Sequence, residues 1–185
     1  MDDWDILDLF FTRSEQAIVE LDAKYGAIFH ALAYNILASR EDADECVNDA
    51  YLGAWNAIPP ERPERLSAWV CRVVRNAALS RRRRDNAIKR GGNYALALEE
   101  LEGVLPAPGN VGDELEAKEL TREIERFLDT LSEENRVIFL RRYWFSDSLR
   151  DIARRTGLSE KAVNVRLTRL RRQLKKYLAE QEVYV

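Results

Sequence analysis

The sequence LRDIARRTGLSEKAVNVRLTRLRRQL (Leu149–Leu174) predicts a helix-turn-helix. A short amphipathic segment is followed by a turn at Gly157 and by a longer helix that Ser159 can cap, which is the layout of this motif. At about 100° per residue, four apolar side chains of the longer helix fall within roughly 60° of one another. We expect these four to form a buried seam: Val163, Leu167, Leu170 and Leu174.

The opposite face of the longer helix is polar and basic. In the major groove of DNA, Lys and Arg bind guanine or phosphate, Asn binds adenine, and the methyl groups of Val or Thr contact the thymine methyl. The candidates for such contacts are Lys161, Asn164, Val165, Arg166, Thr168, Arg169 and Arg172. Near the helix end, salt-dependent phosphate affinity is expected from Arg171, Arg172, Lys175 and Lys176. A solvated basic helix in some other bundle is the alternative.

The composition favours an all-α fold, because only 8 Gly and 5 Pro occur in 185 residues and 46% of the residues are hydrophobic. Apolar side chains recur every three or four residues, which predicts helices over 14–39, from Ser39 to Pro59-Pro60, and from Ala68 to about Lys89. Helical periodicity resumes at Leu120.

A segment rich in Pro, Gly and acidic residues separates the two helical regions and is typical of a flexible linker. The sequence therefore predicts two small helical domains, 1–92 and 120–185, joined by an acidic linker over 93–119.

The net charge of −3 conceals four blocks of alternating sign. Residues 1–61 carry 13 acidic and 3 basic side chains, and residues 91–135 carry 12 and 3. Residues 62–90 carry 10 basic and 2 acidic side chains, and residues 136–185 carry 13 and 5. Two basic blocks suggest two docking places for a polyanion, because local potential matters more than total charge. Charge runs by themselves are more often plain solvated faces, so the motifs must decide.

Several classes of function are not expected. Cys46 and Cys71 form no CxxC pair and His30 is the single histidine, so the chain lacks the usual ligands of a zinc site and we expect reduced thiols, no metal and no cofactor. An acidic N-terminus and the lack of an 18-residue apolar run predict a cytoplasmic protein without membrane insertion. No phosphate loop and no nucleophile with its base are present, so we expect neither an enzyme nor a small-molecule substrate.

Two further stretches carry a family resemblance. The runs DADECVNDAYLGAWNAI (Asp42–Ile58) and RLSAWVCRVVRNAALSRRRR (Arg65–Arg84) are similar to the second conserved region of extracytoplasmic-function (ECF) sigma factors of the sigma-70 family. Leu131–Leu178 resembles their fourth region. The resemblance implies an alternative sigma factor, which directs promoter-specific transcription initiation by bacterial RNA polymerase. An autonomous helix-turn-helix regulator is the alternative, and it would bind duplex DNA without polymerase.

The resemblance also implies where each partner binds. The first run would dock on the β′ clamp helices of core RNA polymerase through Asp44, Glu45, Asn48, Asp49 and Leu52. The second run would capture the non-template strand of the minus-10 element, with the loop Pro59–Ser67 as the pocket of a flipped base. Its contacts would be Arg65, Leu66, Ser67, Arg72, Arg75, Asn76, Arg81, Arg82, Arg83 and Arg84. The C-terminal helix would then read the minus-35 element.

The remaining implications concern other partners and two details of the chain. The family binds the β flap of polymerase and usually has an anti-sigma factor. The linker acids would mimic nucleic acid near the polymerase cleft or belong to a plain tether: Glu99, Glu100, Glu102, Asp113 and Glu114. Trp69 is expected in the core with Val73 and Ala77, and Val70 stands where primary sigma factors carry a second tryptophan, which implies weaker strand separation.

Overall fold

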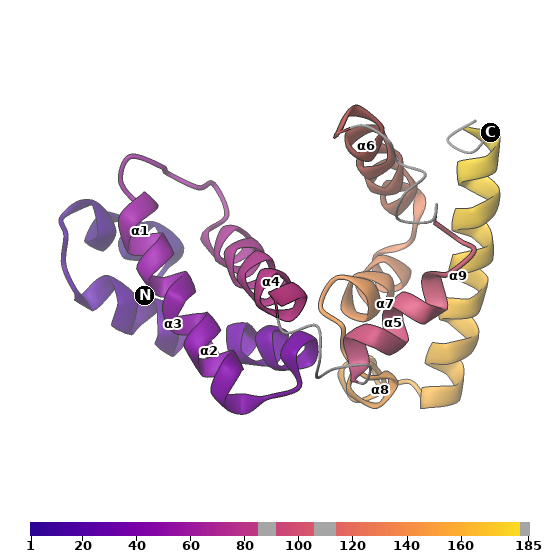
Figure 1. The fold of residues 1–185 in the computed structure, drawn as a ribbon, viewed down its shortest axis with the longest axis horizontal. Helices are drawn as coiled ribbons and strands as arrows, with labels where there is room; N and C mark the ends of the chain where they lie inside the picture. Colours follow the sequence, from indigo (N-terminus) through magenta and orange to yellow (C-terminus); the bar gives the residue numbers. More distant parts are fainter. Residues whose placement is uncertain (85–91, 106–113, 182–185) are drawn as a thin grey trace. The chain divides into compact units, whose positions relative to one another are not determined.

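The computed structural model of the chain describes residues 1–84, 92–105 and 114–181. Every regular element in these ranges is an α-helix, which confirms the predicted all-α fold. The chain divides into two compact units, Met1–Gly92 and Asn93–Val185 (Figure 1). The expected end of the third predicted helix and the Pro- and Gly-rich part of the predicted linker lie outside the described residues.

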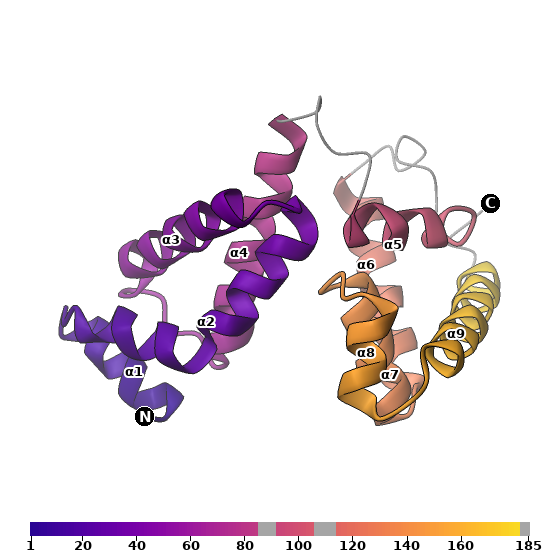
Figure 2. The same cartoon turned by 90° about the horizontal axis from the view of Figure 1, so that it is seen from below.

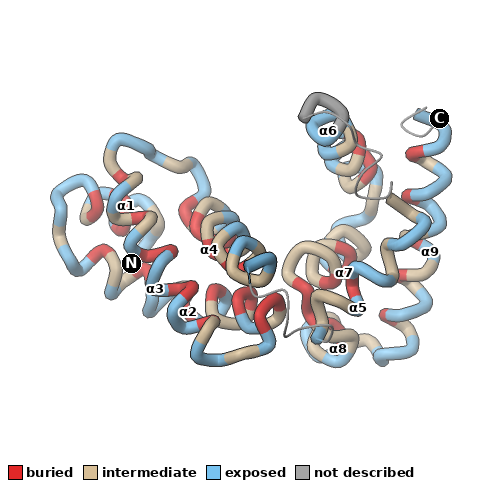
Figure 3. Tube along the Cα trace, in the orientation of Figure 1, coloured by how far each residue is buried: buried red, intermediate tan, exposed pale blue. Residues whose placement is uncertain are grey.

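The N-terminal unit contains four helices: α1 (Asp3–Phe11), α2 (Gln16–Leu37), α3 (Arg40–Ala57) and α4 (Leu66–Arg84). Helices α2, α3 and α4 pack against one another in all three pairs, and α1 packs on α2 and α4 (Figure 2). Their buried residues lie on the faces that the helices turn toward one another (Figure 3), as the recurrence of apolar residues every three or four positions requires. The result is a three-helix bundle closed at one side by α1.

Helix α1 was missed in the sequence analysis, although its N-terminus carries a clear signal. The backbone N–H of Asp5 donates to the Asp2 carboxylate at 2.9 Å, and the N–H of Asp2 donates to the Asp5 carboxylate at 3.3 Å. This reciprocal cap precedes Ile6, Leu7 and Phe10, all at most 1% exposed. An acidic capping box followed by apolar residues at helical spacing predicts such a helix.

The buried face of α4 differs from the expected one. Leu66, Val70 and Val74 are 0% exposed, whereas Trp69 and Val73 lie at the half-buried edge of the helix. Ala77 is also half-buried. The bundle packs on the stripe of residues spaced four apart from Leu66, so the predicted role of Trp69 in the core is wrong. The predicted DNA contact of Leu66 is wrong too, because a side chain without exposed surface cannot touch DNA.

The C-terminal unit contains α5 (Asn93–Leu101), α6 (Glu114–Thr130), α7 (Glu133–Tyr143), α8 (Leu149–Thr156) and α9 (Glu160–Glu180). Two hydrophobic clusters share α9. One holds Ile138 of α7, Ile152 and Ala153 of α8, and the first half of the α9 seam. The other places Phe127 of α6 and Phe139 of α7 on the second half of the seam, Leu170 and Leu174, and on Leu178, which follows the seam along α9. The predicted seam of α9 is thereby confirmed.

The prediction that residues 93–119 form a linker is wrong for the parts of this segment that the structure describes. The segment begins with α5, which packs on α7, and α6 already begins at Glu114. Ala97 of α5 is buried, and Val104 and Leu105 pack against the cluster around Phe127 and Phe139. Short apolar segments in an acidic background give little helical signal of their own, because most helix stability comes from packing against other elements.

The burial of Leu66 leads to a stability prediction. Leu66→Ala should reduce the free energy of unfolding of the N-terminal unit by about 2 to 5 kcal/mol, because it leaves a cavity in a close-packed core. Leu52→Ala is the matched control, since Leu52 of α3 is 59% exposed and its truncation should change stability by about 0.5 kcal/mol at most. Hydrogen exchange of the amides of this unit measures both, and equal effects would contradict the assigned burial.

Candidate nucleic-acid interface

The helix-turn-helix is present as predicted, in the pair α8 and α9. Gly157 adopts the left-handed conformation with φ of +71°, and this ends α8. The Ser159 hydroxyl then accepts a hydrogen bond from the N–H of Ala162 at 3.1 Å and caps α9. Ser148 caps α8 in the same manner, accepting from Asp151 N–H at 3.1 Å. Both helix starts are thus set by local hydrogen bonds of short polar side chains.

The face of α9 opposite its seam is open to solvent. Of the seven predicted groove-reading residues, Arg166 and Thr168 are half-buried. The other five are exposed: Lys161, Asn164, Val165, Arg169 and Arg172. The structure therefore leaves a polar and basic stripe of α9 exposed to solvent.

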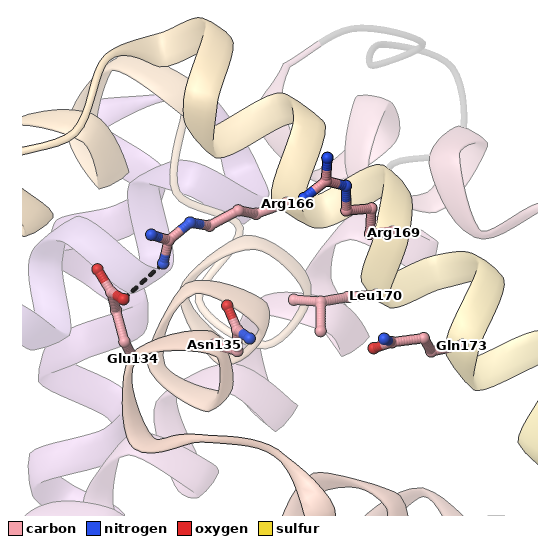
Figure 4. A pocket seen from close by; sticks show the side chains of 6 residues that line it. All are labelled: Glu134, Asn135, Arg166, Arg169, Leu170 and Gln173. Carbon is pink, nitrogen blue, oxygen red and sulfur yellow. Dashed lines mark ion pairs between the residues drawn. The ribbon is translucent and has the colours of Figure 1, made fainter.

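Arg166 lies at the border between α9 and the start of α7. Its guanidinium forms an ion pair with Glu134 at 2.5 Å, across a groove of about 440 Å³ (Figure 4). Asn135 of α7 and Arg169, Leu170 and Gln173 of α9 also line this groove. This ion pair holds the Arg166 side chain against α7 of the same unit. For the predicted contact with DNA, a phosphate would have to replace Glu134 as the partner of Arg166.

Arg171 was predicted to contact phosphate, but in the structure its guanidinium is already bound by other side chains. Its guanidinium donates to Glu100 at 3.1 Å, to the Tyr143 hydroxyl at 2.8 Å and to the Thr168 hydroxyl at 3.1 Å. Its side chain is only 17% exposed. The free phosphate-binding arginine expected from the sequence is instead part of a polar network within the C-terminal unit.

The five residues predicted to bind polymerase form one exposed face of α3. Asp44, Glu45, Asn48, Asp49 and Leu52 are all exposed, because they alternate with the buried stripe that packs on α2 and α4. Two of them have partners inside the unit. Asp44 accepts from His30 at 2.9 Å, and Glu45 pairs with a guanidinium of α4 at 2.6 Å. The face combines negative charge with one exposed leucine.

The arginines of α4 fall into two groups. Arg81 bridges Asp42 at 2.8 Å and Glu45 at 2.6 Å, and Arg82 donates to the carbonyl of Ile36 at 2.8 Å. These two fasten the end of α4 to α2 and α3, which the sequence analysis did not anticipate. The other predicted minus-10 contacts, apart from the buried Leu66, are exposed or half-buried: Arg65, Ser67, Arg72, Arg75, Asn76, Arg83 and Arg84.

Two residues of the loop before α4, Glu61 and Arg62, make contacts that the sequence analysis did not anticipate. The indole N–H of Trp69 donates to Glu61 at 3.0 Å, which leaves the ring half-buried beside the loop. Arg62 pairs with Asp8 of α1 at 2.9 Å, and its guanidinium lies over the rings of Trp4 and Phe11 at 5.7 and 5.0 Å. No periodicity links Arg62 to α1, because Arg62 and Asp8 are 54 positions apart in sequence.

Other kinds of site find little support in the part of the chain that the structure describes. No group of three or more His, Cys, Asp or Glu side chains there is placed to hold a metal ion. None of the described helices combines the length and the apolar character that crossing a bilayer requires. Cys46 and Cys71 are buried and are not joined in a disulfide, and burial raises the pKa of Cys46 to about 11.

These two helical units, one with a helix-turn-helix, define a class of DNA-binding transcription proteins. Residues 21–88 match the family described as sigma-70 region 2, and residues 121–174 match the family described as sigma-70, region 4. Two curated relatives are ECF RNA polymerase sigma factors SigM from strains of Mycobacterium tuberculosis. They are 29% identical over 95% of this chain and 84% of the relative (strain H37Rv), and 30% identical over 88% and 77% (strain Erdman).

The chain therefore belongs to the ECF sigma factors of the sigma-70 family. It is an alternative sigma factor of transcription initiation. A solved structure with lower similarity is described as CnrH in complex with the cytosolic domain of CnrY. It is 22% identical, with a TM-score of 0.44 over 96% of this chain and 97% of that chain.

The turn of the motif leads to a prediction that compares two glycines. Gly157→Ala should destabilise the C-terminal unit by about 1 kcal/mol, because an L-residue is strained at positive φ, although the space around this position is open. Gly53→Ala should instead stabilise the N-terminal unit by up to about 1 kcal/mol, because Gly53 lies inside α3 and its new methyl would contact Val73 at 3.7 Å. Hydrogen exchange distinguishes the two signs. Destabilisation by both substitutions would contradict this account.

Proposed function

We propose that the two units divide promoter recognition between them. The N-terminal unit binds core RNA polymerase and captures the non-template strand of the minus-10 element. The C-terminal unit reads the minus-35 element in the major groove through α9. The observation that supports this proposal is that α9 has one buried face and one exposed face. Because the seam is buried, the opposite, basic face is exposed to solvent.

The proposed role of α9 rests on the chemistry of its exposed residues. Lys161, Arg169 and Arg172 supply cations for guanine or phosphate, and Asn164 supplies an amide with the geometry to bind adenine. Val165 is 42% exposed, so its methyl groups are available to a thymine methyl. Helix-turn-helix proteins place the first turns of the second helix in the groove, and these are the turns that carry Lys161, Asn164 and Val165.

The proposed polymerase contact is the exposed face of α3. Asp44, Glu45 and Asp49 give this face a negative potential that favours a basic partner, and Leu52 is 59% exposed in the same stripe. Charged residues set the orientation and rate of association, and burial of apolar surface such as that of Leu52 favours it further. This combination fits a helical partner such as the β′ clamp helices.

The proposed minus-10 site is the loop before α4 together with the first turns of α4. A flipped base needs a preformed pocket, because its unstacking costs a few kcal/mol. Arg65, Arg72 and Asn76 are exposed and supply polar contacts there. The half-buried ring of Trp69 adds an aromatic surface for base stacking, which is worth about 1 to 3 kcal/mol per base. Trp69 thus takes the place of Leu66 in this proposal.

The remaining parts of the proposal follow the family. A protein with these partners acts in the cytoplasm, beside the polymerase, and as a specificity subunit without catalysis of its own. Contact of the C-terminal unit with the β flap and control by an anti-sigma factor are proposed on the family resemblance.

The test separates a sigma factor from an autonomous regulator. An electrophoretic shift assay with a promoter fragment, selected by run-off transcription on a genomic library, is run with and without core polymerase. A sigma factor shifts the fragment specifically only with core enzyme, and it supports a defined transcript. Tight specific binding by the chain alone, with no effect of core polymerase, would replace this proposal by the autonomous regulator.

The α3 face leads to a prediction about core binding. Substitution of Asn48 and Asp49 by Lys should abolish co-purification with core polymerase and leave the helical content unchanged, because both side chains are exposed and a reversed charge opposes a basic partner. Replacement of Glu15 and Gln16 by Lys is the control. It makes the same charge change at exposed positions where α2 begins and should leave co-purification intact. Unchanged co-purification of the Asn48 and Asp49 variant would remove α3 from the interface.

A further inference from the structure

A single carboxylate of α5 joins three groups of the C-terminal unit. Glu100 accepts from the Arg142 guanidinium of α7 at 2.6 and 3.2 Å, and from the Tyr143 hydroxyl at 3.0 Å. It also accepts from Arg171 of α9 at 3.1 Å. Arg142 further donates to the carbonyl of Asp147 at 2.9 Å. The carboxylate thus ties α5 to α7 and α9 at once.

The charged side chains of this network are largely buried, which makes their pairing important for stability. The Arg142 side chain is 3% exposed, and those of Arg171 and Glu100 are 17% and 23% exposed. A guanidinium this buried needs a carboxylate partner, because an unpaired buried charge is strongly unfavourable. The Tyr143 hydroxyl is protonated at neutral pH, as any tyrosine with an ordinary pKa is, and burial raises its pKa further; it therefore acts as a donor to Glu100. The Glu100 carboxylate therefore accepts hydrogen bonds from two guanidinium groups and one neutral hydroxyl group.

The network reaches the face of α9 that turns away from the seam. Arg171, held by Glu100, donates its other amino group to the Thr168 hydroxyl at 3.1 Å, and that hydroxyl donates to the carbonyl of Asn164 at 2.9 Å. The hydroxyl is occupied on both sides, so the methyl group is the part of Thr168 that remains for a DNA base. The orientation of a predicted groove-reading residue thus depends on a carboxylate of another helix.

The segment that supplies this carboxylate lies outside both matched family regions, 21–88 and 121–174. Helix α5 has nine residues, which is too short for stability by itself. It is held by the buried Ala97, by the packing of the adjoining Val104 and Leu105, and by Glu100. In the C-terminal unit, α5 is therefore a packed element and not only a connection.

We propose that Glu100 is a positioning residue of the DNA-reading helix: it holds Arg171 away from the DNA phosphates and, through Arg171, sets the orientation of Thr168. This inference rests on the proposed reading of the minus-35 element by α9. It assigns different roles to two adjacent arginines. Arg172 is exposed and contacts phosphate, whereas Arg171 is held by a carboxylate and contributes no phosphate contact.

The first test compares these two arginines in the full chain bound to core polymerase. The logarithm of the affinity for a duplex that contains the minus-35 element falls linearly with the logarithm of salt concentration, with a slope of about 0.9 per phosphate contact. Arg172→Gln should reduce this slope by about 0.9, and Arg171→Gln should leave it unchanged. A reduction of the slope by Arg171→Gln of the same size would overturn the inference.

The second test releases Arg171 by removing the charge that holds it. Glu100→Gln should steepen the slope by about 0.9, because Arg171 becomes available to a phosphate. The preference for the minus-35 element over a scrambled sequence should fall about fivefold, which corresponds to one weak base contact. The double variant Glu100→Gln with Arg171→Gln should restore the slope but not the preference. If Glu100 contributes only to folding, the folded fraction of Glu100→Gln keeps the slope of the unaltered chain, and this result would overturn the inference.

Glu99→Gln is the matched control, because Glu99 is an exposed residue of the same helix and loses the same charge. Identical slopes and preferences of the Glu99 and Glu100 variants would overturn the inference. If Glu100→Gln unfolds the unit, the comparison of Arg171 with Arg172 decides, because it keeps the pair of Glu100 and Arg142. Failure of the proposed function is a different result, in which the unaltered chain with core polymerase shows no preference for the minus-35 element.

Discussion

The buried seam of α9 is the interaction on which the C-terminal unit depends. The four seam residues and Leu178 are at most 2% exposed and contribute to both hydrophobic clusters, which include residues of α6, α7 and α8. Full burial of a leucine or valine stabilises a fold by about 1.5 to 3 kcal/mol, so an orientation of α9 that exposed the seam would lose several such contributions. Since a helix has two sides, the same burial commits the polar and basic face to solvent, where DNA is available.

The same constraint acts on α3 in the N-terminal unit, with the opposite sign of charge. Ala43, Val47, Ala50 and Ala54 pack inward, which leaves acidic residues and Leu52 outside. Arg81 then connects this face to α4 through Asp42 and Glu45. The proposed polymerase-binding helix and the proposed strand-capturing helix are thus joined by ion pairs. Their relative position within this unit is a property of the bundle rather than of either surface.

The sequence analysis succeeded where periodicity and local chemistry act together. The seam of α9, the turn at Gly157 and the cap at Ser159 are decided by residues within one segment, and the structure confirms all three. It failed at α5 and at the core stripe of α4, where Leu66 is buried and Trp69 is not. In α4 the apolar residues cover more than one side of the helix, so only the neighbouring helices decide which side is buried.

By itself, the sequence determined the all-α fold and the helix-turn-helix, because helical periodicity, capping residues and turn glycines are local signals, and its resemblance to known sequences indicated the family. Only the tertiary structure decided which charged residues are available to partners. Arg171 and Arg172 are adjacent and chemically identical, yet one is held by Glu100, 71 positions away, and the other is exposed. Such pairing depends on which helices meet, and no pattern along the chain encodes it.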